Sequence, residues 1–97
     1  MDISLSEKVA LITGGSRGIG LAIAKSYADA GAQVMITSRK EDALREAAAF
    51  IGGGASYIAG NAGDTDFAQK CVSATLEQFG KIDIFVNNAA TNPYSGP

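Results

Sequence analysis

The 97-residue chain contains no histidine, no tryptophan, two prolines and a single cysteine, Cys71. Without histidine the chain lacks the commonest general base and metal ligand, and no other ligand cluster stands out, so we expect no metal site. One cysteine cannot form an internal disulfide, and Cys71 falls within a helical pattern, where a small buried apolar residue is expected. A single cysteine with no disulfide partner fits a reducing compartment, and we expect a cytoplasmic protein.

Long apolar runs and an excess of basic charge are also absent. The apolar run from Val9 to Ile12 is broken by glycine and preceded by Asp2 and Glu7, which is unlike a signal peptide or a membrane span. The net charge is −2, so nucleic acid and anionic membranes are poor candidate partners. With 46% hydrophobic residues, the chain has the composition of a globular protein and the length of at most one domain.

Strand and helix patterns alternate along the chain. Apolar runs predict strands at 9–12, 33–37, 56–59 and 82–86. Helical spacing predicts helices at 19–30, 41–50 and from 64 or 65 to 79. Each helix is expected to pack through one stripe of its surface. The expected stripes are Ile19, Ala22, Ile23, Ser26, Tyr27 and Ala30 in the first helix, Leu44, Ala47, Ala48 and Ile51 in the second, and Ala68, Cys71, Val72, Thr75, Leu76 and Phe79 in the third.

The order βαβαβαβ predicts an α/β fold with a doubly wound parallel sheet and right-handed crossovers. The expected spatial order of the strands is 3-2-1-4, which puts a switch point between the first and the fourth strand. Ligands of such sheets bind at the carboxyl ends of the strands that flank the switch point. A glycine-rich segment after the first strand, and Asn87 and Asn88 after the fourth, fall there.

The glycine-rich segment follows Thr13 and includes Gly14, Gly18 and Gly20, after which an apolar helix begins at once. Main-chain amides at a helix start, reinforced by the helix dipole, form an anion site. We interpret the segment as the pyrophosphate cradle of a dinucleotide. Judged from the loop alone, a plain tight turn is the alternative.

Two other nucleotide sites fit this segment less well. Gly15 and Gly20 have the spacing of a phosphate-cleaving P-loop, but Leu21 and Ala22 replace its lysine and its hydroxyl residue, so triphosphate hydrolysis is not expected. A methyltransferase of similar fold usually has an acidic residue before its glycine loop, where Thr13 stands. We therefore rank methyl transfer last.

The pattern Thr-Gly-x-x-x-Gly-x-Gly from Thr13 to Gly20 resembles that of the short-chain dehydrogenase/reductase family, which has a Rossmann-type fold. Residues 83–90, Asp-Ile-Phe-Val-Asn-Asn-Ala-Ala, resemble the Asn-Asn-Ala-Gly ending of the family's fourth strand, with Ala90 in place of glycine. At residues 60–64, Asn61 stands where the family often has aspartate, as in members that resemble 3-oxoacyl-carrier-protein reductases. A polar loop is the alternative reading of the two asparagines.

The resemblance implies a site for a nicotinamide dinucleotide. In the family the paired asparagines brace the sheet and line the adenosine pocket, and Asn61 would accept a hydrogen bond from the adenine amino group. The implied cofactor-binding residues are Gly14, Ser16, Arg17, Gly18, Ile19, Gly20, Ser38, Arg39, Asn61, Ala62, Asn87, Asn88 and Ala89.

The end of the second strand bears on the choice of coenzyme. An NAD-selective site has a carboxylate there for the ribose 2′-hydroxyl, whereas this chain has Ser38 and Arg39, with Glu41 and Asp42 falling in the next helix. Arg39 and Ser38, with Arg17 from the other side, suit a 2′-phosphate. We therefore predict NADP(H) rather than NAD(H); solvated charge at Arg39 is the alternative.

The family's catalytic Tyr-x-x-x-Lys pair does not occur, because Tyr27, Tyr57 and Tyr94 all lack a lysine four residues later. We name no catalytic residue and expect residues 1–97 to be the N-terminal part of a single Rossmann domain, truncated after the fourth strand. The resemblance implies an oxidoreductase that interconverts small ketones and secondary alcohols and is a homo-oligomer when complete. The alternative is a noncatalytic dinucleotide-binding module or assembly partner.

Overall fold

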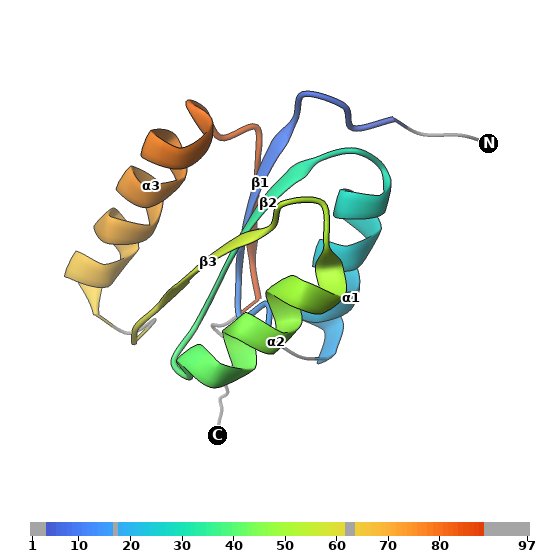
Figure 1. The fold of residues 1–97 in the computed structure, drawn as a ribbon. Coiled ribbons are helices and arrows are strands. Elements are labelled where there is room, and N and C mark those ends of the chain that lie inside the picture. Colours follow the sequence, from blue (N-terminus) through green and yellow to red (C-terminus); the bar gives the residue numbers. More distant parts are fainter. Residues whose placement is uncertain (1–3, 17, 62–63, 89–97) are drawn as a thin grey trace, which may run out of the picture.

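The computed structural model describes residues 4–16, 18–61 and 64–88. Its elements alternate as predicted (Figure 1). The strands are β1 (Val9–Thr13), β2 (Gln33–Ser38), β3 (Ser56–Ala59) and β4 (Ile84–Asn87). The helices are α1 (Gly18–Asp29), α2 (Glu41–Ile51) and α3 (Thr65–Phe79). No helix among these described residues has the length and apolar character needed to cross a membrane.

The four strands form one parallel sheet in the order β3-β2-β1-β4, as predicted. Thr13 pairs with Thr37 on one side and with Asn87 on the other. The carboxyl ends of β1, β2 and β4 therefore reach the same edge of the sheet. This alignment brings the segments that follow these strands together.

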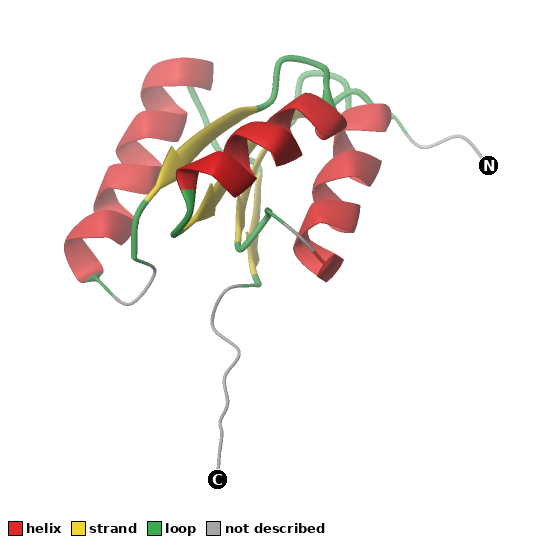
Figure 2. Ribbon diagram, turned by 60° about the horizontal axis from the view of Figure 1, so that its bottom comes forward, coloured by secondary structure: helices red, strands yellow, loops and turns green. Residues whose placement is uncertain are grey.

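Helices α1 and α2 cover one face of the sheet and α3 covers the other (Figures 1 and 2). Because alternate side chains of a strand point to opposite faces, Ala10 and Ile12 belong to the core under α1 and α2, and Leu11 belongs to the core under α3. Both faces of β1 are thus buried, which explains why its sequence is a continuous apolar run.

The fourth strand begins two residues later than its apolar run suggests. Asp83 closes a reciprocal pair of hydrogen bonds with Val9: the Asp83 N–H donates to the Val9 carbonyl (2.9 Å), and the Val9 N–H donates to Asp83 Oδ2 (2.8 Å). Ile82 packs against the core under α3 instead of entering the ladder. The prediction of 82–86 was therefore wrong at its start, and the strand extends to Asn87.

The predicted contact faces of two helices were also wrong in part. In α1 the buried residues are Gly20 and Ala24, and Ile19 is 71% exposed. In α3 Cys71 is buried as predicted, but Val72 and Leu76 are 42% and 45% exposed. Ile23 and Tyr27 of the α1 stripe do pack against the core, and Thr75 of the α3 stripe is fully buried. Each stripe was thus only partly right, because periodicity alone does not say which neighbour a helix meets. The stripe predicted for α2 is confirmed by buried residues at its Leu44, Ala47 and Ile51.

Candidate functional site

The turn that follows β1 is attached to the end of β2. The N–H groups of Gly14 and Gly15 both donate to the carbonyl of Thr37, at 2.8 and 3.2 Å. Gly15 is buried, and a Cβ built there would lie 2.6 Å from Cγ2 of Ile36. Gly14 and Gly18 have φ values of 70° and 64°, a conformation that favours glycine. The glycines are thus required by the shape and packing of the turn.

These hydrogen bonds restrict which amides can receive an anion. The amides of Gly14 and Gly15 are already engaged with β2. The N–H groups of Gly18, Ile19 and Gly20 open helix α1 and have no acceptor within it. The first turn of α1 is therefore the part of this segment that suits an anion, since the helix dipole there also favours negative charge.

Gly20 allows α1 to begin directly against the turn. A Cβ at this position would overlap the carbonyl oxygen of Gly14 and lie 2.7 Å from Nδ2 of Asn88. Because one contact is with main chain, a side chain cannot be accommodated by a simple rotamer change. Close helix–strand packing of this kind is the role of the last glycine in dinucleotide-binding turns.

Thr13, Asn87 and Asn88 connect β1 to β4 at the same edge. The Thr13 hydroxyl donates to Oδ1 of Asn87 (3.0 Å) and accepts from the N–H of Asn88 (2.9 Å). Nδ2 of Asn88 donates to the carbonyl of Gly14 (3.3 Å). The two asparagines thus brace the switch point and hold the glycine turn from the side opposite β2.

The end of β2 offers hydroxyl and basic groups. Ser38 is half-buried, and a hydrogen bond joins its hydroxyl to that of Ser16 (3.2 Å). Arg39 is exposed, and Glu41 and Asp42 lie in the first turn of α2. No carboxylate therefore belongs to the tip of β2, in agreement with the sequence.

The end of β3 lies beside that of β2. The Gly60 N–H donates to the carbonyl of Ser38 (2.8 Å), and Asn61 follows at an exposed position. The Asn61 carbonyl accepts from the N–H of Asp64 (3.0 Å), whose side chain in turn caps α3 by accepting from the Asp66 N–H (2.9 Å). Asn61 is thus positioned at the edge that also carries the glycine turn.

Three of the predicted cofactor-binding residues, Arg17, Ala62 and Ala89, lie outside the described residues. The other ten lie along the carboxyl ends of the four strands or in the first turn of α1. Among them Ile19 is unusual because a large apolar side chain is 71% exposed at the start of a helix. Its exposure was not anticipated, because the sequence pattern placed it in a packed stripe.

The resolved pKa shifts of the described residues lie away from this edge. The Val9 N–H and Lys81 lower the pKa of Asp83, at the start of β4. A hydrogen bond with Tyr57 and the charge of Asp42 raise the pKa of Arg45 on α2. Burial raises the pKa of the Cys71 thiol in α3. The described part of the site thus offers anion-binding and hydrogen-bonding groups, and its residues contain no cluster of metal ligands.

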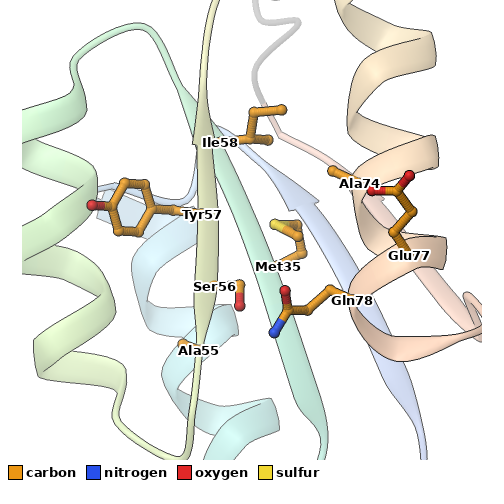
Figure 3. Close-up of a pocket in the computed structure, with 8 residues that line it drawn as sticks. All are labelled: Met35, Ala55, Ser56, Tyr57, Ile58, Ala74, Glu77 and Gln78. Carbon is orange, nitrogen blue, oxygen red and sulfur yellow. The ribbon is translucent and has the colours of Figure 1, made fainter.

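A groove of about 570 Å³ lies elsewhere, between β3 and α3 (Figure 3). Ser56 and Ile58 line it from the strand, Glu77 and Gln78 line it from the helix, and Met35 forms its floor. The Tyr57 ring points to the opposite face of the sheet. The described residues that line the groove include no basic side chain, and none of them belongs to the glycine turn.

The glycine turn at the switch point of a 3-2-1-4 parallel sheet defines the class of dinucleotide-binding α/β folds. Residues 8–96 match the family described as short chain dehydrogenase. The chain therefore belongs to the short-chain dehydrogenase/reductase family.

Relatives cover most of this chain. Dehydrogenase/reductase SDR family member 4 of Caenorhabditis elegans is 45% identical over 93 residues, which are 92% of this chain and 36% of that protein. Sorbitol dehydrogenase of Cereibacter sphaeroides is 46% identical over 86 residues, 89% of this chain and 34% of its own length. The chain thus spans about a third of the length of the curated relatives it matches.

The fold is also similar to that of solved structures. The crystal structure of L-sorbose reductase from Gluconobacter frateurii, complexed with NADPH and L-sorbose, superimposes with a TM-score of 0.90. It is 38% identical in sequence, and the match covers 99% of this chain and 38% of that chain. A short chain dehydrogenase from Bacillus anthracis has a TM-score of 0.84 and 41% identity, with 90% of this chain and 36% of its own covered.

Proposed function

We propose that this chain is the cofactor-binding part of an NADP(H)-dependent oxidoreductase that interconverts small ketones and secondary alcohols. The observation that carries the proposal is the start of α1 at the sheet's switch point, against a glycine turn held by Thr37 on one side and Asn88 on the other. A preorganised turn of this kind binds a diphosphate without first having to fold.

The coenzyme we propose is NADP(H). The tip of β2 carries Ser38 and Arg39 and no carboxylate, which suits a 2′-phosphate better than a 2′-hydroxyl. Arg17 is proposed to act with them. The NADPH complex of the related L-sorbose reductase supports this choice.

Other residues are proposed to hold the remaining parts of the dinucleotide. Asn61 would accept a hydrogen bond from the adenine amino group, and Ala62 and Ala89 would pass close to the adenosine. Ile19, which is 71% exposed, would cover an apolar ring surface of the ligand. A nicotinamide bound there would supply hydride transfer to the carbonyl carbon of a ketone or from the carbinol carbon of a secondary alcohol, and the residues of this chain would bind and orient it.

Calorimetric titration of the chain with NADPH and with NADH tests the proposal. We expect both to bind and NADPH to bind more tightly. If neither binds, the proposed function is wrong. If a protein that carries this chain within the full length of its relatives binds NADPH but fails to reduce any of a panel of small ketones, the noncatalytic-module alternative is supported instead.

A further inference from the structure

Strand β3 has one face that α3 covers incompletely. Helix α3 packs on β1 and β2, and Ser56 and Ile58 of β3 are half-buried beside the groove of about 570 Å³ (Figure 3). A second hollow, of about 490 Å³, shares Ile58, Ala74 and Glu77 with this groove and continues it along the outer flank of α3. The two hollows together are called the β3–α3 groove below.

The main chain of β3 is open along its outer side. Among the described residues, β3 pairs with β2 alone. The Gly60 N–H points to β2, where it donates to the Ser38 carbonyl (2.8 Å). Because the main-chain groups of successive strand residues point alternately to the two sides, those of Ile58 also face β2, and those of Tyr57 and Ala59 face outward. The edge thus offers two donors and two acceptors to an added strand.

This edge lacks the features that usually protect an exposed strand. Such edges carry charged side chains, proline or a bulge. Residues 55–60 read Ala-Ser-Tyr-Ile-Ala-Gly and contain neither charge nor proline, and the pairing with β2 runs without a bulge from Ser56 to Ala59. An extended peptide suits an unprotected edge beside a groove, because its main chain continues the sheet and the groove receives alternate side chains.

The charges on the helix wall of the β3–α3 groove favour a basic peptide. Glu77 lines both hollows and Asp66 lines the second. Both side chains are exposed, and neither belongs to an ion pair within the described part of the chain. Lys70 is the one basic side chain among the described lining residues. A second copy of this chain, whose net charge is −2, would bring the same excess of carboxylates, so charge favours a basic partner.

We propose that β3 and the β3–α3 groove bind an extended, basic peptide segment of a partner protein. The segment pairs with β3 as an added strand and places a lysine or arginine side chain beside Glu77. This interaction surface contains no residue of the proposed coenzyme site, and the inference does not depend on the proposed function.

The test uses three fluorescein-labelled peptides of six residues with capped ends. The first repeats Lys-Val, which puts its lysines on one face of a strand. The second repeats Glu-Val. The third is the lysine peptide with a methyl group on every main-chain nitrogen, which removes its main-chain donors and keeps its charge. Fluorescence anisotropy measures their binding to the 97-residue chain. We expect the lysine peptide to bind at least about threefold more tightly than either of the others.

Two charge reversals separate the groove from the general charge of the chain. Glu77→Lys changes the groove, and Glu46→Lys makes the same change at an exposed position of α2, on the other face of the sheet. We expect Glu77→Lys to weaken binding of the lysine peptide about threefold to tenfold. Glu46→Lys should change it less than about twofold. Equal weakening by the two substitutions would overturn the inference.

Ala59→Pro tests the edge itself. The outward N–H of Ala59 is not needed for pairing with β2, so proline leaves that pairing in place and removes one donor from the edge. We expect the lysine peptide to bind about threefold more weakly or worse, with an unchanged circular dichroism spectrum. If this variant does not fold, the N-methylated peptide tests the same hydrogen bonds.

The inference is overturned if the lysine peptide does not bind, or if it binds no better than the glutamate or the N-methylated peptide. It is also overturned if Ala59→Pro reduces self-association in sedimentation velocity while the peptide does not bind, because the edge would then take a second copy of this chain.

Discussion

Gly20 belongs to the glycine pattern of the sequence, packs against the glycine turn, and is proposed to bind the coenzyme. Gly20→Ala puts a methyl group against the carbonyl oxygen of Gly14, so either α1 or the glycine turn must move. We expect a loss of about 1–3 kcal/mol in the free energy of unfolding, as for other overpacked sites, and weaker binding of NADPH. Urea unfolding and calorimetry measure the two effects.

Ala22→Ser, at an exposed position of the same helix, is the control for Gly20→Ala. It changes a helical residue without approaching the turn and should leave both measurements nearly unchanged. A Gly20→Ala variant as stable as the wild type would mean that the helix does not start against the turn.

A substitution at Arg39 tests whether the chain prefers NADPH to NADH. Arg39→Asp should weaken NADPH binding by about tenfold or more, because it removes the proposed charge-assisted hydrogen bond to the 2′-phosphate and adds repulsion. NADH binding should change much less, since a carboxylate can accept from a 2′-hydroxyl. The ratio of the two dissociation constants is the measurement.

Lys70→Asp makes the same change of charge at an exposed position of α3. It serves as the control for long-range electrostatics. Equal weakening of NADPH and NADH by Arg39→Asp would show that Arg39 does not contact the 2′-phosphate.

At the scale of elements, the interior of a helix or strand was predictable and its ends and faces were less so. Cys71 was placed correctly in α3 because helical spacing identifies a turn-by-turn repeat. Val72 and Leu76 have the same spacing but lie on a flank that no described element covers fully. For β4, Ile82 is as apolar as a strand residue, and only the Asp83 contact with Val9 determined where the ladder starts.

That contact makes the start of β4 sensitive to acid. The hydrogen bond from the Val9 N–H is the largest cause of the lowered pKa of Asp83. Lys81, whose Nζ lies 3.2 Å from Asp83 Oδ2, lowers this pKa further. A carboxyl whose pKa is lower in the folded state stabilises the fold above its unfolded pKa, and this stabilisation is lost as the pH falls through the folded value. We expect Asp83→Ala to destabilise the chain at neutral pH and to make its stability less dependent on pH below about 4.

Thermal unfolding of the wild type and of Asp83→Ala across this range of pH measures the effect. Asp29→Ala removes an exposed carboxylate that pairs with Lys25 and is the matched control. If wild type and Asp83→Ala lost stability in parallel as the pH falls, the Asp83 carboxylate would not be what holds β4 to β1.

At the scale of the whole molecule, the two faces of the sheet are covered unequally. Helix α3 packs on β1 and β2, and Phe85 of β4, which pairs with Leu11 on the same face, is 58% exposed. Among the residues that the structure describes, β4 is also an edge strand. An exposed edge beside uncovered apolar side chains favours association between chains.

We therefore expect the 97-residue chain to associate as its concentration rises and Phe85→Lys to reduce that association. Sedimentation velocity over a range of concentrations measures it. Phe50→Lys is a matched control, because Phe50 is also 58% exposed but belongs to α2, on the other side of the sheet. Equal effects of the two substitutions, or a monomer at every concentration, would contradict this expectation.

The sequence by itself determined the α/β class, the strand order and the edge at which the candidate site lies. These follow from local periodicity, from the handedness of crossovers and from the residues at the strand ends, all of which are properties of short segments. Only the tertiary structure decided that Thr37 occupies the amides of Gly14 and Gly15, that Ser16 meets Ser38, and that Ile19 is exposed. These contacts join segments distant in the chain, and their geometry depends on how closely α1 approaches the sheet, which no local pattern specifies.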